Sequence, residues 1–109
     1  ETDFDLGMKV NLYGSLNVIE CLREISKSKA ILEGKPQIYF YSSTDYTLCF
    51  NDTNRRQPWT EESFRLSPVS YGCQKACMEI LISDYTRKGF IDGRVGRFAA
   101  VIGRPGYVD

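Results

Sequence analysis

The chain has 109 residues, of which 42% are hydrophobic, and its 14 basic residues balance its 14 acidic ones. This balance lacks the basic excess of nucleic-acid-binding proteins, and no apolar run approaches the roughly 20 residues that span a membrane. We therefore expect a globular, cytoplasmic protein that binds neither nucleic acid nor membranes.

The residue types available for catalysis are limited. The sequence contains no histidine, which removes the commonest general base in proteins. The four cysteines, Cys21, Cys49, Cys73 and Cys77, lack the pairwise spacing of zinc ligands. We expect them to be reduced thiols packed in the interior, and we expect no metal site. Tyrosine, lysine and carboxylate side chains remain as candidates for acid-base chemistry.

The first predicted element is a helix from Thr2 to about Lys27, with Thr2 or Asp3 as its N-cap. The apolar residues spaced for one buried stripe are Phe4, Met8, Val18, Leu22 and Ile25. Gly7, Asn11 and Gly14 share another face. Because glycine inside a helix costs up to about 1 kcal/mol, this face predicts the close approach of a cofactor or of backbone. The alternative is loose packing around a solvated Asn11.

Two strands are predicted, from Gln37 to Tyr41 and from about Arg94 to Ile102. The first is an aromatic and β-branched run that suits a parallel strand covered on both faces, and it ends in Ser42 and Ser43. In open α/β sheets, ligands bind beyond the carboxyl ends of the strands, which is where Ser43 is expected. Paired serines also close many ordinary strands. Residues 44–68 show no periodicity and are predicted to form a loop.

The second predicted helix runs from Pro68 to Lys88, with Ser70 as its cap and Gly89 as the glycine that ends it. Its apolar residues occupy more than one face, which predicts burial on more than one side. They are Cys77, Met78, Ile80, Leu81, Ile82 and Tyr85. A right-handed crossover between the strands makes them parallel and brings the start of this helix to the sheet edge near Ser43.

Tyr71 and Lys75 lie four residues apart at the start of this helix, and therefore on one helical face. A tyrosine hydroxyl ordinarily loses its proton near pH ~10, and a neighbouring ammonium group stabilises the phenolate that a base near neutral pH requires. The same spacing also occurs by chance on helices without a catalytic role. An acid-base pair at Tyr71 and Lys75 is thus a hypothesis that the rest of the chain must support.

Several motifs, in the same order along the chain, resemble those of the extended short-chain dehydrogenases/reductases, the family of NAD-dependent epimerases and dehydratases. They are Asn11-Leu12-Tyr13-Gly14-Ser15, Ser42-Ser43, Tyr71 to Lys75, and Arg97 through Gly103-Arg104-Pro105-Gly106. The second helix is most similar to the D-erythronate dehydrogenase branch of that family. The resemblance implies an α/β fold in which residues 1–109 are the central, incomplete part of a Rossmann-like doubly wound parallel sheet and form a partial NAD-binding domain.

The resemblance also implies catalytic roles. Tyr71 would be the general base, and Lys75 would support its phenolate and hold the nicotinamide ribose, so that both residues also bind the cofactor. Ser43 would hydrogen-bond the reacting oxygen of the substrate. Asn11 would support a proton relay.

Binding roles are implied as well. Ser42 and Phe98 would contact the cofactor, which is NAD, with NADP as the alternative. Arg104 would clamp a substrate carboxylate beside Ser43, although a structural ion pair would use Arg104 equally well. The implied reaction oxidises the 2-hydroxyl of a small sugar acid such as D-erythronate by hydride transfer to the nicotinamide. A nucleotide-sugar epimerase or dehydratase could use the same residues, and a truncated, non-catalytic remnant could retain them.

The family's glycine-rich turn, which cradles the cofactor pyrophosphate, does not occur in this sequence. We therefore expect the chain to be the middle of a longer subunit. Two strands and two helices leave apolar faces uncovered. By resemblance, the two long helices would form a homodimer interface in the complete protein.

Overall fold

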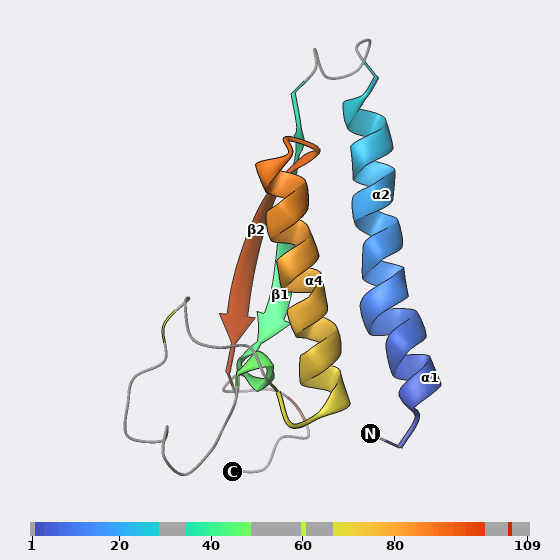
Figure 1. The fold of residues 1–109 in the computed structure, drawn as a ribbon, viewed down its shortest axis with the longest axis vertical. Helices are drawn as coiled ribbons and strands as arrows, with labels where there is room; N and C mark the ends of the chain where they lie inside the picture. The colour runs from blue at the N-terminus through green and yellow to red at the C-terminus, as the bar shows by residue number, and fades with distance from the viewer. Residues whose placement is uncertain (1, 29–34, 49–59, 61–66, 100–104, 106–109) are drawn as a thin grey trace.

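The computed structural model describes residues 2–28, 35–48, 60, 67–99 and 105. Its elements, in chain order, are α1 (Phe4–Gly7), the π-helical segment η1 (Met8–Gly14), α2 (Ser15–Ser26), β1 (Gln37–Thr44), the short 3-10 helix η2 (Asp45–Thr47), α4 (Ser70–Arg87) and β2 (Ile91–Phe98). The first three form one long helical stretch (Figure 1). The predicted order of helix, strand, helix and strand is confirmed.

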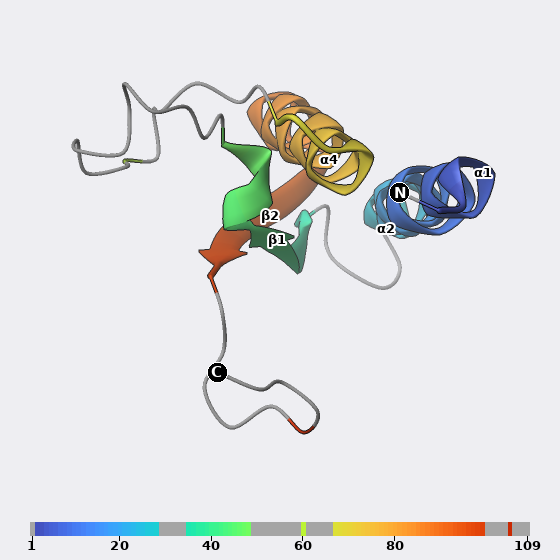
Figure 2. The same cartoon turned by 90° about the horizontal axis from the view of Figure 1, so that it is seen from below.

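β1 and β2 pair in parallel, as predicted, with Gln37 opposite Ile91 and Thr44 opposite Phe98. Both helical stretches lie on the same side of this two-stranded sheet (Figure 2). On the other face Ile38 and Phe40 are 77% and 58% exposed. In the part of the chain that the structure describes, the predicted cover on both faces of the first strand is therefore not found, whereas the uncovered apolar face predicted for two strands and two helices is confirmed.

The first helical stretch begins as predicted, because the Asp3 side chain accepts a hydrogen bond from the Leu6 amide at 2.9 Å. The predicted buried stripe is only partly correct. Leu22 packs against the core, but Val18 is exposed and its neighbour Ile19 is fully buried. The physical reason is the π-helical segment, whose wider turns change the phase of the helix between α1 and α2.

α4 begins at Ser70, and its N-cap is Val69 without a side-chain hydrogen bond. The prediction that Ser70 caps this helix is therefore wrong. A serine further upstream is used instead, since the hydroxyl of Ser67 accepts a hydrogen bond from the Val69 amide at 3.2 Å. This contact turns the chain into the first turn of α4.

The predicted C-terminal glycine of α4 is confirmed. Gly89 has φ 74°, and the Phe90 amide reaches back to the Tyr85 carbonyl at 2.9 Å, which is the closing hydrogen bond of a Schellman motif. The chain then enters β2 directly. β2 starts at Ile91, earlier than the predicted Arg94. The predicted end at Ile102 lies outside the described residues.

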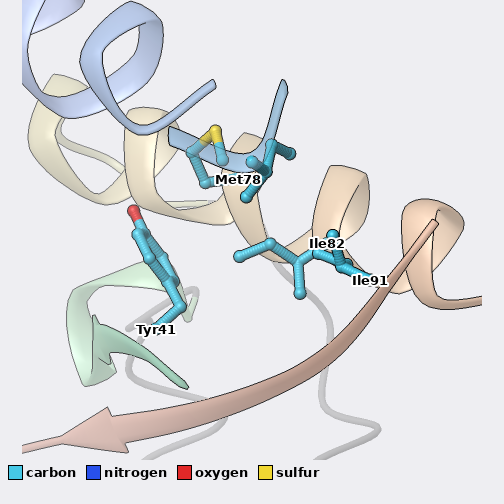
Figure 3. Packing of buried hydrophobic residues seen from close by; sticks show 5 residues of the cluster. Tyr41, Met78, Ile82 and Ile91 are labelled. Carbon is cyan, nitrogen blue, oxygen red and sulfur yellow. The ribbon is translucent and has the colours of Figure 1, made fainter. Parts of the chain in front are cut away.

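The core lies between the helices and the sheet (Figure 3). Its buried residues are Ile19, Tyr41, Met78, Ile82 and Ile91. α4 contributes Met78 and Ile82, whereas Ile80 is 55% exposed. The prediction that this helix is buried on more than one side is nevertheless confirmed, because α4 packs against the sheet on one side and against the first helical stretch, where Gln74 meets Asn11, on another.

Three cysteines, Cys21, Cys73 and Cys77, are free and exposed. They are unpaired, as expected, but the prediction that they pack in the interior is wrong. Cys49 lies outside the described residues, as does most of the predicted loop after β1, of which the structure describes η2. Among the helices described here, none has the length and apolar character needed to cross a bilayer.

Candidate active site

Lys75 is held at the carboxyl end of β1. Its Nζ donates a hydrogen bond to the backbone oxygen of Ser42 at 3.0 Å, and lies 4.6 Å from the ring centroid of Tyr41 and 5.9 Å from that of Tyr71. A cation near aromatic ring faces is attracted by their negative π surface. Burial lowers the pKa of Lys75. The sequence-predicted pair of Tyr71 and Lys75 is therefore brought together around one ammonium group.

Tyr41 belongs to this site although sequence analysis did not single it out. It is buried, and burial raises its pKa to about 12, so that its hydroxyl stays protonated at neutral pH. Its ring supports Lys75 from the side of the sheet. The sequence does contain an indication of this position. Tyr41 lies two residues before Ser43, and alternate residues of a strand point to the same face of the sheet.

Tyr71 is 41% exposed and has access to solvent. Its ring meets that of Tyr46, in η2, edge to face, with the centroids 6.4 Å apart. The next residue, Gly72, allows this contact. A Cβ atom at position 72 would lie 2.0 Å from the Tyr46 carbonyl oxygen and 2.1 Å from the Ser67 hydroxyl. Only glycine lets the first turn of α4 approach η2 so closely.

Ser43 is buried, and its hydroxyl donates a hydrogen bond of 2.6 Å to the carboxylate of Glu79. Glu79 is also bound by the guanidinium of Arg97. Sequence analysis assigned no role to Glu79 or Arg97. Glu79 follows Lys75 by four residues and Tyr71 by eight, so helical spacing does place it on the same face of α4.

Asn11 and Gly7, in the first helical stretch, contact α4 at the side chain of Gln74. The Asn11 side-chain amide donates a hydrogen bond to Gln74 Oε1 at 2.9 Å, and a Cβ atom at Gly7 would lie 2.9 Å from Gln74 Nε2. A close approach does occur at Gly7, but the approaching group is the side chain of Gln74, whereas the prediction named a cofactor or backbone. The alternative of a solvated Asn11 is wrong, because its amide is used in packing the two helices together.

The structure does not bring Phe98 together with Tyr71 and Lys75. Its ring packs edge to face against Phe40, 6.3 Å between centroids, on the face of the sheet away from α4. Arg104, the predicted substrate residue, lies outside the described residues. The side chains that do converge on the carboxyl end of β1 are Tyr41, Ser43, Tyr71, Lys75 and Glu79.

Comparison with known proteins shows what the chain is similar to. No family model matches the chain. D-erythronate dehydrogenases from Cupriavidus necator and Haemophilus influenzae are 40% and 35% identical to it over 107 and 108 residues, 97% of its length in each case. The crystal structure of a nucleoside-diphosphate-sugar epimerase from Agrobacterium tumefaciens matches 98% of the chain with a TM-score of 0.77 and 30% identity. These similarities support the resemblance to the extended short-chain dehydrogenases/reductases that the sequence motifs indicate.

The chain spans 29% and 30% of the length of the curated relatives that it matches, and 29% of the epimerase chain. The predicted Rossmann-like α/β fold is confirmed by the similarity to the epimerase. The relatives are sugar-related enzymes of two kinds, a dehydrogenase and an epimerase. They differ in reaction, although they share this part of the fold.

Proposed function

We propose that the protein containing this chain is a cytoplasmic, NAD-dependent dehydrogenase that oxidises the 2-hydroxyl group of a small sugar acid, D-erythronate. The observation that carries the proposal is the position of Lys75 Nζ between the rings of Tyr41 and Tyr71 at the end of β1. The names of the two curated relatives support the choice of substrate. Residues 1–109 would supply part of the NAD-binding domain.

The residues present fit a dinucleotide cofactor. A lysine ammonium has three hydrogens to donate, and the Ser42 carbonyl accepts one of them, which leaves donors for ribose hydroxyl groups. Tyr71 is exposed enough to contact a ligand. When bound, NAD supplies the hydride acceptor. NADP remains the alternative, because none of the residues discussed here distinguishes the two.

Each residue then has one task in the proposed reaction. Tyr71, as the phenolate, takes the proton of the substrate hydroxyl, and the charge of Lys75 stabilises that phenolate. Ser43 contacts the reacting oxygen. Asn11, fixed by Gln74, supports the relay that returns the proton to solvent. Arg104 would bind the substrate carboxylate through its planar guanidinium.

The test uses the complete protein, incubated with NAD and D-erythronate, with the formation of NADH followed by absorbance. Tyr71→Phe is expected to abolish turnover while leaving NAD binding, measured by fluorescence titration, nearly unchanged. Tyr13→Phe is the matched control, because it removes the hydroxyl of a tyrosine that is similarly exposed, at 53%, and to which the proposed reaction gives no task. A Tyr71→Phe variant that turns over at the wild-type rate would refute the mechanism.

The similarity to the Agrobacterium epimerase favours a second candidate, a nucleotide-sugar epimerase. An epimerase would retain its cofactor through purification and isomerise a nucleotide sugar without net formation of NADH. The same assay separates the candidates, since only a dehydrogenase accumulates NADH with D-erythronate. A complete protein that binds no NAD would instead be a non-catalytic remnant.

We also propose that the complete protein is a homodimer that associates through its long helices. The support is a set of exposed apolar side chains on the helical layer, at 45–58% exposure. They are Leu6, Val10, Val18 and Ile80. Exposed apolar side chains in such numbers on one layer favour burial against a partner.

A further inference from the structure

Lys75 and Glu79 carry opposite charges on the same face of α4, four residues apart. Side chains at this spacing on a helix are neighbours, and a lysine and a glutamate placed so ordinarily form an ion pair. Within the part of the chain that the structure describes, these two do not form a salt bridge with each other. Lys75 Nζ donates to the backbone oxygen of Ser42, whereas the carboxylate of Glu79 is bound by Arg97 of β2.

Arg97 binds Glu79 at two points. Its Nε lies 3.0 Å from Oε1, and its Nη2 lies 2.9 Å from Oε2. The Ser43 hydroxyl also donates to Oε1, at 2.6 Å. The side chains of Glu79 and Arg97 are 2% and 16% exposed, so that little solvent screens the pair. Because the planar guanidinium matches both carboxylate oxygens, it fixes the direction of the carboxylate toward β2.

This pairing leaves the charge of Lys75 available. Burial lowers the pKa of Lys75, which is the direction opposite to that produced by a carboxylate bound to the ammonium group. An ammonium group paired with a carboxylate would stabilise the Tyr71 phenolate less, because the two charges largely cancel. The Ser42 carbonyl and the rings of Tyr41 and Tyr71 hold Lys75 without cancelling its charge.

Other titratable groups lie around the two residues. η2 packs against α4 and brings Tyr46 against Tyr71, while the carboxylate of Asp45 in η2 accepts a hydrogen bond from the Thr44 hydroxyl at 3.3 Å. In β1, burial is the main cause of the raised pKa of Tyr41, about 12, and the charges of Glu79 and of neighbouring tyrosines add to it. A change in the net charge of Glu79 and Arg97 would therefore act on the tyrosines as well as on Lys75.

We propose that Arg97 is a positioning residue that binds Glu79 and thereby keeps this carboxylate from pairing with Lys75. The inference rests on the proposed function, in which Lys75 stabilises the Tyr71 phenolate and binds the ribose of NAD. It gives a reason for a buried ion pair beside the site, since such a pair generally stabilises a fold no more than apolar residues of the same size would. In this role Arg97 acts only through Glu79.

The test uses Arg97→Gln in the complete protein. Without the guanidinium charge, the buried carboxylate of Glu79 has Lys75 as a cation on its own helical face, and the two are expected to pair. NAD affinity, measured by fluorescence titration, should weaken roughly tenfold, because Lys75 is drawn away from the ribose. The midpoint pH of the acid limb of kcat/KM for D-erythronate should rise by about one unit, because the phenolate loses stabilisation.

A second variant separates this role from packing. Arg97→Gln combined with Glu79→Gln should return NAD affinity to within about twofold of wild type, and restore the midpoint pH, because no carboxylate remains to pair with Lys75. A loss of folded protein alone would lower the measured rate without moving the midpoint pH. Arg87→Gln is the matched control, since it removes an arginine paired with a surface carboxylate of α4, Asp84, and should change neither measurement.

Each outcome decides the proposal. Wild-type NAD affinity and midpoint pH in Arg97→Gln would overturn it, as would changes that Glu79→Gln does not reverse. If Arg97→Gln does not fold, Arg97→Lys carries the test, because a lysine grips the carboxylate at one point only. It should produce a smaller change in the same direction, again reversed by Glu79→Gln, and wild-type values would overturn the proposal.

Failure of the proposed function gives a different result. A wild-type protein that oxidises no sugar acid would overturn the proposed function, whereas the NAD titrations of Arg97→Gln and of the double variant would still test Arg97. A wild-type protein that binds no NAD would overturn both.

Discussion

Lys75 Nζ lies 3.0 Å from the backbone oxygen of Ser42 and thereby fastens the start of α4 to the carboxyl end of β1. The contact joins residues that are 33 positions apart. It places an ammonium group where the resemblance to the short-chain dehydrogenases/reductases requires one. The ammonium group is thus fixed before any ligand arrives, which is the preorganisation that electrostatic catalysis requires.

Lys75→Met is expected to weaken NAD binding and to lower kcat by roughly 10²- to 10⁴-fold, because the variant loses both the ribose donor and the charge that stabilises the Tyr71 phenolate. Fluorescence titration with NAD and steady-state rates in the complete protein measure the two effects. Lys9→Met, which removes an exposed lysine of η1, is the control. An unaltered NAD titration for Lys75→Met would exclude the ribose contact.

The free energy of unfolding should depend on pH in part through the ionisation of Lys75. Burial lowers its pKa from 10.5, so between the lowered pKa and 10.5 the unfolded chain binds more protons than the folded one. The contribution of Lys75 to the free energy of unfolding therefore becomes more favourable as the pH rises through this window. Urea unfolding of wild type and Lys75→Met at pH values from neutral to about 10 measures the difference. A difference that does not change with pH would contradict the expectation.

Gly72→Ala should destabilise the complete protein by about 1–3 kcal/mol and displace Tyr71, because the added methyl group meets the backbone carbonyl oxygen of Tyr46 as well as the side chain of Ser67. Gly89→Ala is a comparison variant in which the loss of stability has a different physical cause. Nothing lies within 4 Å of its Cβ position, so its cost comes from φ 74° alone. Thermal unfolding ranks the variants, with Cys77→Ala as the neutral control. Loss of activity is expected for Gly72→Ala and not for Gly89→Ala.

The proposed dimer predicts that Val10→Glu combined with Val18→Glu yields a monomer, since two charges would be buried in an apolar interface. Sedimentation equilibrium of the complete protein measures the mass of the assembly. Lys35→Glu changes an exposed residue in the segment before β1 and should leave the assembly intact. A dimer that persists in the double variant would place the interface elsewhere.

Much of the site follows from local pattern. The spacing of Tyr71 and Lys75 is sufficient to predict that they share a helical face, and Gly89 marks the end of that helix because a left-handed residue is required there. The parallel pairing follows from the order of elements and the handedness of crossovers. These features depend on neighbours within a few residues or on general rules of chain connection, so the sequence by itself determines them.

Other features depend on contacts between distant parts of the chain. The π-helical segment that buries Ile19 instead of Val18 coincides with the packing of Asn11 against Gln74, which lies 63 residues further along. In the sequence, Glu79 cannot be distinguished from a solvated helix residue. In the structure, the packing of α4 on the sheet brings Glu79 into contact with Ser43, 36 residues away, and with Arg97. Only the tertiary structure decides such pairings, because the free energy of a buried polar group depends on which partner reaches it.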